Sequence, residues 1–172
     1  MPQMADPNFA KSVILLCDYT AEHGAFGLIV NRPMSEPAHA LVKTEPPVLV
    51  DPQLHLFVGG PVEPRTTWVL MAEAQGPEDE QREICPGLLL SVSHALTLRL
   101  LQQPPSTRTR IIVGYAGWGP GQLDDEISAS SWLTMDVDPA FIFSTPADRL
   151  WETALRRLGT DPSQLQMSSG VH

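Results

Sequence analysis

Residues 110–123 read RIIVGYAGWGPGQL and contain the strongest local pattern in the chain. Ile111, Ile112 and Val113 form an apolar run that predicts a buried strand over residues 110–115. The glycine-rich residues 117–121 predict a loop, and residues 122–130 predict a helix whose first turns carry acids that complement its positive end. A buried strand followed at once by a loop and a helix indicates a mixed α and β structure.

The rest of the chain reads as short elements separated by turns, in keeping with 17 prolines in 172 residues. Asp6-Pro7 is typical of a helix start, residues 38–42 predict a helical turn, and the acid-rich residues 73–83 predict a solvated loop. Helices are predicted over residues 91–102 and 146–158, the second capped by Thr145, with Pro146 at its first position, and ended by Gly159. Strands are predicted over residues 12–18, 24–30, 54–58, 66–71, 87–90 and 140–144.

The strands and helices interleave without a regular βαβ period or an internal repeat. A chain of 172 residues is the length of one domain, so we expect a single domain over residues 1–159 and a polar tail over 160–172. The predicted class is α+β, with a largely antiparallel or mixed sheet and helices on its flanks.

Charge and hydropathy argue against two classes of partner. The net charge is −9, with 11 Lys and Arg against 20 Asp and Glu, so electrostatic repulsion argues against direct binding to nucleic acid. The apolar runs are far shorter than the about 20 residues that span a membrane, and no signal peptide is recognised. Two cysteines in no CxxC pair fit a reducing cytoplasm, where we expect the protein to reside.

No motif predicts a catalytic residue, a metal or a cofactor. Residues 114–123 match neither GxGxxG nor a P-loop, and they hold no lysine for a phosphate. Ser93 and His94 are neighbours that would diverge on a helix, no G-x-S-x-G elbow exists, and the histidines are scattered. The sequence therefore does not decide whether the protein is an enzyme, and the absence of a catalytic motif argues against it.

Polar, aromatic and glycine residues at predicted turns are the candidates for contact with a ligand or a partner. An Arg at a strand end can pair with a carboxylate, and glycines allow a ligand to approach the backbone. The same residues have ordinary structural interpretations: a surface ion pair, a tight turn, and a loop packed on Trp118. The candidate binding residues are Asn31, Arg32, Gly59, Gly60, Tyr115, Gly117, Trp118 and Gln122.

Taken together, these motifs resemble the YqgE/AlgH family of small bacterial proteins, in order along nearly the whole chain. The segments that carry the resemblance are MPQMADPNF (1–9) with Ser12-Val13, HGAFGLIVNRP (23–33), VGGPV (58–62), GYAGW (114–118) with GQL (121–123), and SWL (131–133).

The resemblance implies a bent or split sheet that forms a pseudo-barrel with flanking helices. It implies no reaction, cofactor or catalytic residue, and one branch of the family is labelled a transcriptional regulator. Members commonly have a histidine at the position of Met71. They also carry an apolar strand before the segment matching residues 1–4, so we expect Met1 to be an internal methionine of the natural protein.

Three functions compete. The first is a noncatalytic binding or regulatory module that acts through an unknown protein or small molecule. The alternative is an enzyme whose site is assembled from Asp6, Arg32, Gln122 and Glu126, marked by a carboxylate of raised pKa. The third is a transcriptional regulator that binds nucleic acid directly, which the net charge disfavours.

Overall fold

In the computed structural model, which describes residues 6–160, seven strands form one sheet with the order β1-β2-β7-β4-β6-β5, and β3 pairs with β7 off this path. All pairings are antiparallel except β3 with β7. The strands are β1 (Ile14–Thr20), β2 (Gly24–Ile29), β3 (Phe57–Val58), β4 (Val62–Met71), β5 (Gln81–Cys85), β6 (Leu88–Ser91) and β7 (Thr109–Trp118).

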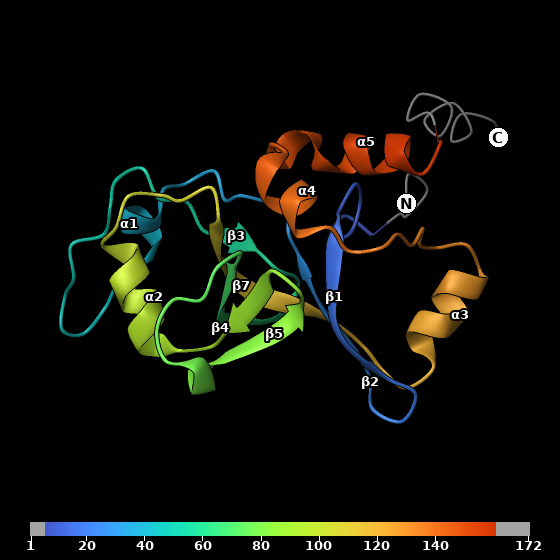
Figure 1. The fold of residues 1–172 in the computed structure, drawn as a ribbon, viewed down its shortest axis with the longest axis horizontal. Helices are drawn as coiled ribbons and strands as arrows, with labels where there is room; N and C mark the ends of the chain where they lie inside the picture. The colour runs from blue at the N-terminus through green and yellow to red at the C-terminus, as the bar shows by residue number, and fades with distance from the viewer. Residues whose placement is uncertain (1–5, 161–172) are drawn as a thin grey trace.

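Helices flank this sheet on several sides (Figure 1). α1 and α2 lie together at one end, α4 and α5 lie beside β1, and α3 lies near β2 on the far side from α2. Within residues 6–160 none of the helices is long and apolar enough to cross a membrane. The helices are α1 (Ala38–Leu41), α2 (His94–Leu101), α3 (Gln122–Ser128), α4 (Pro139–Ser144), α5 (Ala147–Arg157) and the 3-10 turn η1 (Glu78–Glu80).

The central strand β7 belongs to both halves of a split sheet. Its first half pairs with β4 and with β3, and its last residues pair with β2, where Ala25 lies opposite Trp118. The two halves separate beside Gly59, at a point that we call the strand fork. The Gly59 N–H donates to the Val113 carbonyl, and the Gly59 carbonyl accepts from the Ile29 N–H, both at 2.8 Å. The expected α+β fold, a bent sheet that nearly closes into a barrel, is therefore confirmed.

Glycine is required where two backbone segments come into contact at this strand fork. Gly114 has a φ of +72°, and a Cβ there would lie 2.5 Å from the Gly60 carbonyl oxygen. A Cβ on Gly60 would lie 2.2 Å from the Tyr115 backbone. No side chain fits between backbones this close, so the VGG and VGY segments are explained by packing alone.

Two apolar clusters fill the two sides of the sheet. One joins Leu28, Leu70 and Ile112 to α4 and α5, and the other joins Val69 and Met71 to α2. Met71 is fully buried in this second cluster, so in this chain the position commonly held by a histidine is a core position.

A buried arginine ties α4 to the sheet. The guanidinium of Arg110, only 7% exposed, donates to the carbonyls of Val30 and Ile142 and lies against the rings of Phe57 and Phe143. Burial lowers its pKa to about 10.

Several sequence predictions of local structure were wrong. Residues 140–144 form helix α4 instead of a strand, because Asp138 accepts a hydrogen bond from the Phe141 N–H (3.1 Å) and Pro139 occupies the first turn. The acidic loop ends early in strand β5, β7 continues through Gly117 to Trp118, and only two residues of 54–58 pair as β3. Asp6–Phe9 forms a turn rather than a helix, and no side chain caps α5.

Other predictions are confirmed. The helical turn predicted at residues 38–42 forms over residues 38–41, and Gly159 ends α5 with a φ of +72°. The expectations for Met1 and for the tail beyond Thr160 lie outside the described residues.

Candidate functional site

Asn31 and Arg32 hold the turn that precedes β1. The Asn31 side chain accepts from the Val13 N–H (2.8 Å) and donates to the Lys11 carbonyl (3.0 Å). The Arg32 guanidinium donates to three backbone carbonyls of that turn, those of Pro7, Asn8 and Ala10. Both side chains are thus engaged with the protein's own backbone.

Trp118 and Gln122 converge on one carboxylate, that of Glu126 in α3. The indole N–H groups of Trp118 (2.9 Å) and Trp132 (2.7 Å) donate to the same oxygen, Oε2. The Gln122 amide donates to Oε1 (2.9 Å), while its carbonyl oxygen accepts from the Gly119 N–H (3.0 Å). This network fixes the glycine-rich loop onto the start of α3.

These hydrogen bonds set the charge of Glu126. Burial on its own would raise the pKa of this carboxyl, but the donors Trp132, Gln122 and Trp118 together outweigh burial, so its pKa lies below the ordinary value. A carboxylate held in its charged form by three donors is a poor general acid. The expected mark of the enzyme alternative, a raised carboxyl pKa, is absent at Glu126.

Tyr115 belongs to an aromatic cluster on the other side of β7. Its ring meets Phe26 at 5.3 Å and Trp68 at 6.1 Å between centroids, both edge to face. The cluster borders an open hollow that Tyr115, Gly117 and Trp118 share with Asp18 and other residues. Gly59 and Gly60 lie at the strand fork described above. The predicted site residues are thus divided among the turn, the fork, the aromatic cluster and the Glu126 network.

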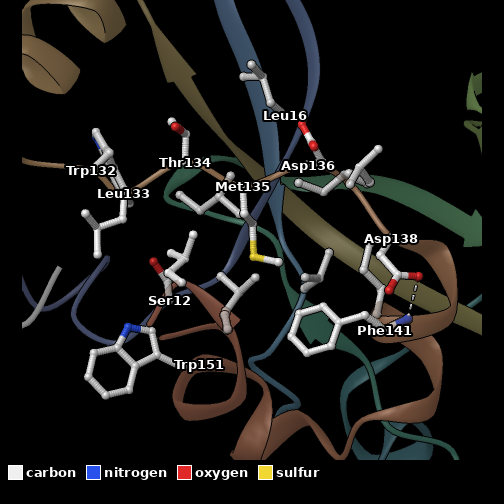
Figure 2. A pocket seen from close by; sticks show the side chains of 18 of the residues that line it. Ser12, Leu16, Trp132, Leu133, Thr134, Met135, Asp136, Asp138, Phe141 and Trp151 are labelled. Atoms are coloured by element: carbon white, nitrogen blue, oxygen red, sulfur yellow. Dashed lines mark hydrogen bonds between the residues drawn. The ribbon is translucent and has the colours of Figure 1, made fainter. Parts of the chain in front are cut away.

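A separate cavity is an apolar groove between β1 and the chain that joins α3 to α4 (Figure 2). Its volume is about 310 Å³. One wall is formed by residues 12–16, the other by residues 132–138, and α4 and α5 close the base. We call this cavity the β1 groove; Trp118 alone among the predicted binding residues lines it.

The β1 groove runs along the edge of the sheet. Successive side chains of a strand point to opposite faces, so a cavity on one face would touch every second residue. This one touches five residues in succession, Ser12 to Leu16, of which the last three belong to β1. Its lining therefore wraps around the edge strand.

Most of the large apolar side chains that are exposed to solvent line this groove. Ten large apolar side chains are exposed within residues 6–160, and six of them line it. Figure 2 shows Met135 pointing into the groove between its two walls. The six are Leu16, Ile127, Leu133, Met135, Val137 and Leu158.

No strand or helix is predicted over residues 132–138, although the sequence of this wall carries a signal. Leu133, Met135 and Val137 alternate with Thr134, Asp136 and Asp138, which is the period of a strand with one apolar face. The segment lies between two helices and pairs with no strand of the described residues, so this alternating pattern does not form a strand there.

Metal and thiol chemistry find little support among the described residues. Residues 6–160 contain no group of three His, Cys, Asp or Glu side chains placed to hold a metal ion. Burial raises the pKa of the Cys17 thiol to about 12, partly opposed by the charge of Arg82. Cys17 is therefore a buried, unreactive thiol.

Comparisons with known proteins place the chain. The family model described as AlgH-like matches residues 1–163. The chain belongs to the AlgH-like family. A UPF0301 protein of Paraburkholderia phymatum is 36% identical over 99% of this chain and 90% of the relative. A UPF0301 protein of Myxococcus xanthus is 37% identical over 100% of this chain and 94% of its own length.

Solved structures show the same fold. The solution structure of the AlgH protein from Pseudomonas aeruginosa has a TM-score of 0.74 and 33% identity, and covers 100% of this chain and 92% of that one. A crystal structure from Corynebacterium diphtheriae, at 24% identity, has a TM-score of 0.70 and covers 99% and 87%. The resemblance read from the sequence is thereby confirmed.

Proposed function

We propose that this AlgH-like protein is a noncatalytic binding module whose ligand or partner occupies the β1 groove. The observation that carries the proposal is the concentration of exposed apolar side chains in one cavity of about 310 Å³. Ligand cavities typically measure about 300–1,000 Å³ and have mostly apolar walls with a few polar groups. Ser12, Thr134 and Asp136 provide such polar groups here.

Apolar surface exposed to water is also unfavourable for the free protein, and a binding function would explain why this surface is left exposed. Transfer of apolar surface out of water is worth about 25 cal/mol per Å², so covering the groove would stabilise the complex. The previously considered contacts Asn31, Arg32 and Gln122 are engaged internally, whereas Leu133 and Met135 have free surface. Binding through the groove uses side chains that the fold itself does not need.

A regulatory role, if the protein has one, would act through this groove and not through direct contact with DNA. The net charge of −9 repels a phosphate backbone. We place the protein in the cytoplasm, where its free cysteines Cys17 and Cys85 would stay reduced.

The test is binding of Nile red, an uncharged dye whose emission reports apolar surroundings. We expect the protein to bind it, and Leu133→Asp to weaken binding by about tenfold, which corresponds to about 1.4 kcal/mol. The matched control is Leu49→Asp, because Leu49 is 88% exposed and lies outside the groove. Equal binding by all three proteins, or none by the unmodified chain, would contradict the proposal.

A further inference from the structure

The open hollow beside Tyr115 lies on one face of three neighbouring strands. Asp18 of β1 pairs with Phe26 of β2, and Phe26 pairs with Gly117 of β7, so these three positions point to the same face. Residues two positions apart on a strand share a face, which adds Thr20 and Tyr115 to it. The opposite face of the same strands packs against α3. The hollow therefore belongs to the side of the sheet away from α3.

Residue 117 shows why the hollow is open. A Cβ at Gly117 would lie 3.3 Å from the Tyr115 ring and 4.0 Å from the Val62 side chain, so a side chain there would compete with that ring for the same space. Gly117 has no positive φ, so the backbone itself does not require glycine. The hollow measures about 580 Å³, within the range of about 300–1,000 Å³ typical of ligand cavities. Its size therefore suits a small ligand.

The lining of the hollow attracts positive charge. Phe26 stacks on Trp68 at 4.7 Å between centroids with a tilt of 38°, and Trp68 lies outside the lining, so the opposite face of Phe26 is left for a ligand. Aromatic faces carry partial negative charge. The carboxylate of Asp18, directly across from Phe26, adds a full negative charge, and the described lining residues include no Lys or Arg. An anion is therefore repelled here and a cation is attracted.

We propose that this hollow binds a free organic ammonium cation, a charged nitrogen carried on a compact apolar body. Such a group is attracted to an aromatic face, as at Phe26, while Asp18 supplies the opposite charge. An uncharged molecule of the same shape gains neither attraction. The inference goes beyond the proposed function and does not rest on it, because the hollow shares only Trp118 with the β1 groove.

Arg82 competes with such a ligand for Asp18. Its guanidinium lies 3.1 Å from the Asp18 carboxylate, and both side chains are more than half exposed. An exposed ion pair is weak, and a carboxylate can accept from more than one donor. Removing Asp18 should therefore weaken the binding of a cation, whereas removing Arg82 should strengthen it. General damage to the fold would not change the affinity in opposite directions.

The first experiment compares choline with 3,3-dimethylbutan-1-ol, in which carbon replaces the charged nitrogen. Each is added to the full 172-residue chain at up to about 10 mM, which detects dissociation constants in the millimolar range. Amide shifts of Asp18, Phe26 and Gly117 are followed by NMR. We expect choline to shift these signals and the neutral alcohol to bind at least about fivefold more weakly. Equal binding of the two, or no shift with choline, would overturn the proposal.

Variants then locate the site. Asp18→Asn should weaken choline binding about fivefold, and Arg82→Ala should strengthen it about twofold. The matched control is Glu73→Gln, because Glu73 forms an equally exposed ion pair with Arg108 outside the hollow and its loss should change nothing. Gly117→Val should abolish binding by filling the hollow; where this variant does not fold, Asp18→Asn decides. An equal effect of Glu73→Gln and Asp18→Asn would show attraction by net charge alone and overturn a local site.

Phosphatidylcholine vesicles carry the same ammonium group on a membrane surface. We expect no co-sedimentation with them, because the lipid phosphate beside the ammonium would be repelled by Asp18. Co-sedimentation that choline reverses would identify a lipid headgroup as the ligand and overturn a free cation.

Nile red separates this inference from the proposed function. Choline should not displace the dye, since the two cavities are distinct. If Nile red binds and choline does not, the β1 groove stands and the cation site is wrong. If choline binds and Nile red does not, the cation site stands and the proposed function is wrong. Displacement of Nile red by choline would show a single shared site and overturn the cation site in the hollow.

Discussion

At the scale of single residues, Glu126 shows how a charged side chain can be structural. Two indole N–H groups and one amide meet its carboxylate, and they join the end of β7 to α3 and to the segment that follows α3. Hydrogen bonds to a charged acceptor are the stronger kind, worth about 1.5–3 kcal/mol each before competing costs. Glu126 therefore also supports one wall of the β1 groove through Trp132.

Replacing this carboxylate should remove a contribution to stability that depends on pH in a defined direction. The folded-state pKa of Glu126 lies below its unfolded value of about 4.3, so its contribution is full above that pH and is lost as the pH falls through the folded pKa. We expect Glu126→Gln to lower the free energy of unfolding by about 1–2 kcal/mol at pH 7. The difference from the unmodified chain should shrink below pH about 4, as measured by urea unfolding followed by tryptophan fluorescence.

Glu152→Gln is the matched control for this prediction. Glu152 is half exposed on α5 and pairs with Arg156 at 3.6 Å, so its loss should change stability very little. If the loss of unfolding free energy caused by Glu126→Gln stays constant from pH 7 down to pH 3, the charge of Glu126 does not stabilise the fold.

Sequence patterns single out polar residues at the ends of elements but do not decide their role. Asn31, Arg32 and Gln122 stand out because they are polar at predicted strand or helix ends. Whether such groups face a ligand or the protein's own backbone depends on contacts between residues about 20 positions apart, as between Arg32 and Ala10. Local sequence patterns carry no information on such contacts.

At the scale of elements, the errors fall where a short apolar run fits either a helix or a strand. The run Ala140–Phe143 has no period long enough to choose between them. The preceding Asp138-Pro139 was the better guide, because it is a helix start by both capping and proline geometry. The strongly bounded helices α2 and α5 lie close to their predicted bounds, whereas β7 extends beyond its predicted end to Trp118.

The end of α5 illustrates a boundary that the sequence does predict, and it can be tested. Gly159 donates to the Arg156 carbonyl and Thr160 donates to the Leu155 carbonyl, both at 3.0 Å, which is a Schellman motif. A Cβ at Gly159 would meet nothing within 4 Å, so Gly159→Ala should cost only the left-handed backbone, about 1 kcal/mol. For a chain of this size that lowers the Tm by about 2–4 °C in a thermal melt.

Gly119→Ala is the natural comparison for Gly159→Ala. Gly119 has no positive φ, and a Cβ there would come no closer than 3.9 Å to another atom, so its replacement should leave the Tm nearly unchanged. If Gly159→Asn, which tolerates the left-handed region, melts no higher than Gly159→Ala, backbone strain is not the cause.

At the scale of the whole molecule, the curvature of the sheet was foreseen only through the family resemblance. Alternation of strands and helices indicated α+β, but nothing local showed that β7 would serve two halves of the sheet. The apolar groove was not foreseen either, because it is made by β1, by residues 132–138 and by α4 and α5, which only the fold brings together.

Hydrogen bonds from one side chain, rather than a strand ladder, bridge the gap in the nearly closed barrel. Arg82 of β5 donates to the Cys17 carbonyl and to the Asp18 carboxylate (3.1 Å), across the gap between the two terminal strands of the sheet. Both charged side chains are more than half exposed, so the ion pair adds little to global stability. Its effect should be local, on how often β1 separates from β5.

Cys17 reports that separation, because it is buried in β1 beside the Arg82 contact. In a Cys85→Ser background, we expect Arg82→Ala to speed labelling of Cys17 by N-ethylmaleimide about fivefold. This is the change expected if the free energy needed to open the gap locally falls by about 1 kcal/mol. Burial is the main reason that the pKa of Cys17 is raised, and the charge of Arg82 lowers it. Removing Arg82 would by charge alone make the thiol less reactive, so faster labelling can come only from opening. Arg108→Ala, which breaks an equally exposed pair with Glu73, should leave the rate unchanged, and a rate as slow in Arg82→Ala would show that the gap is held shut by the core instead.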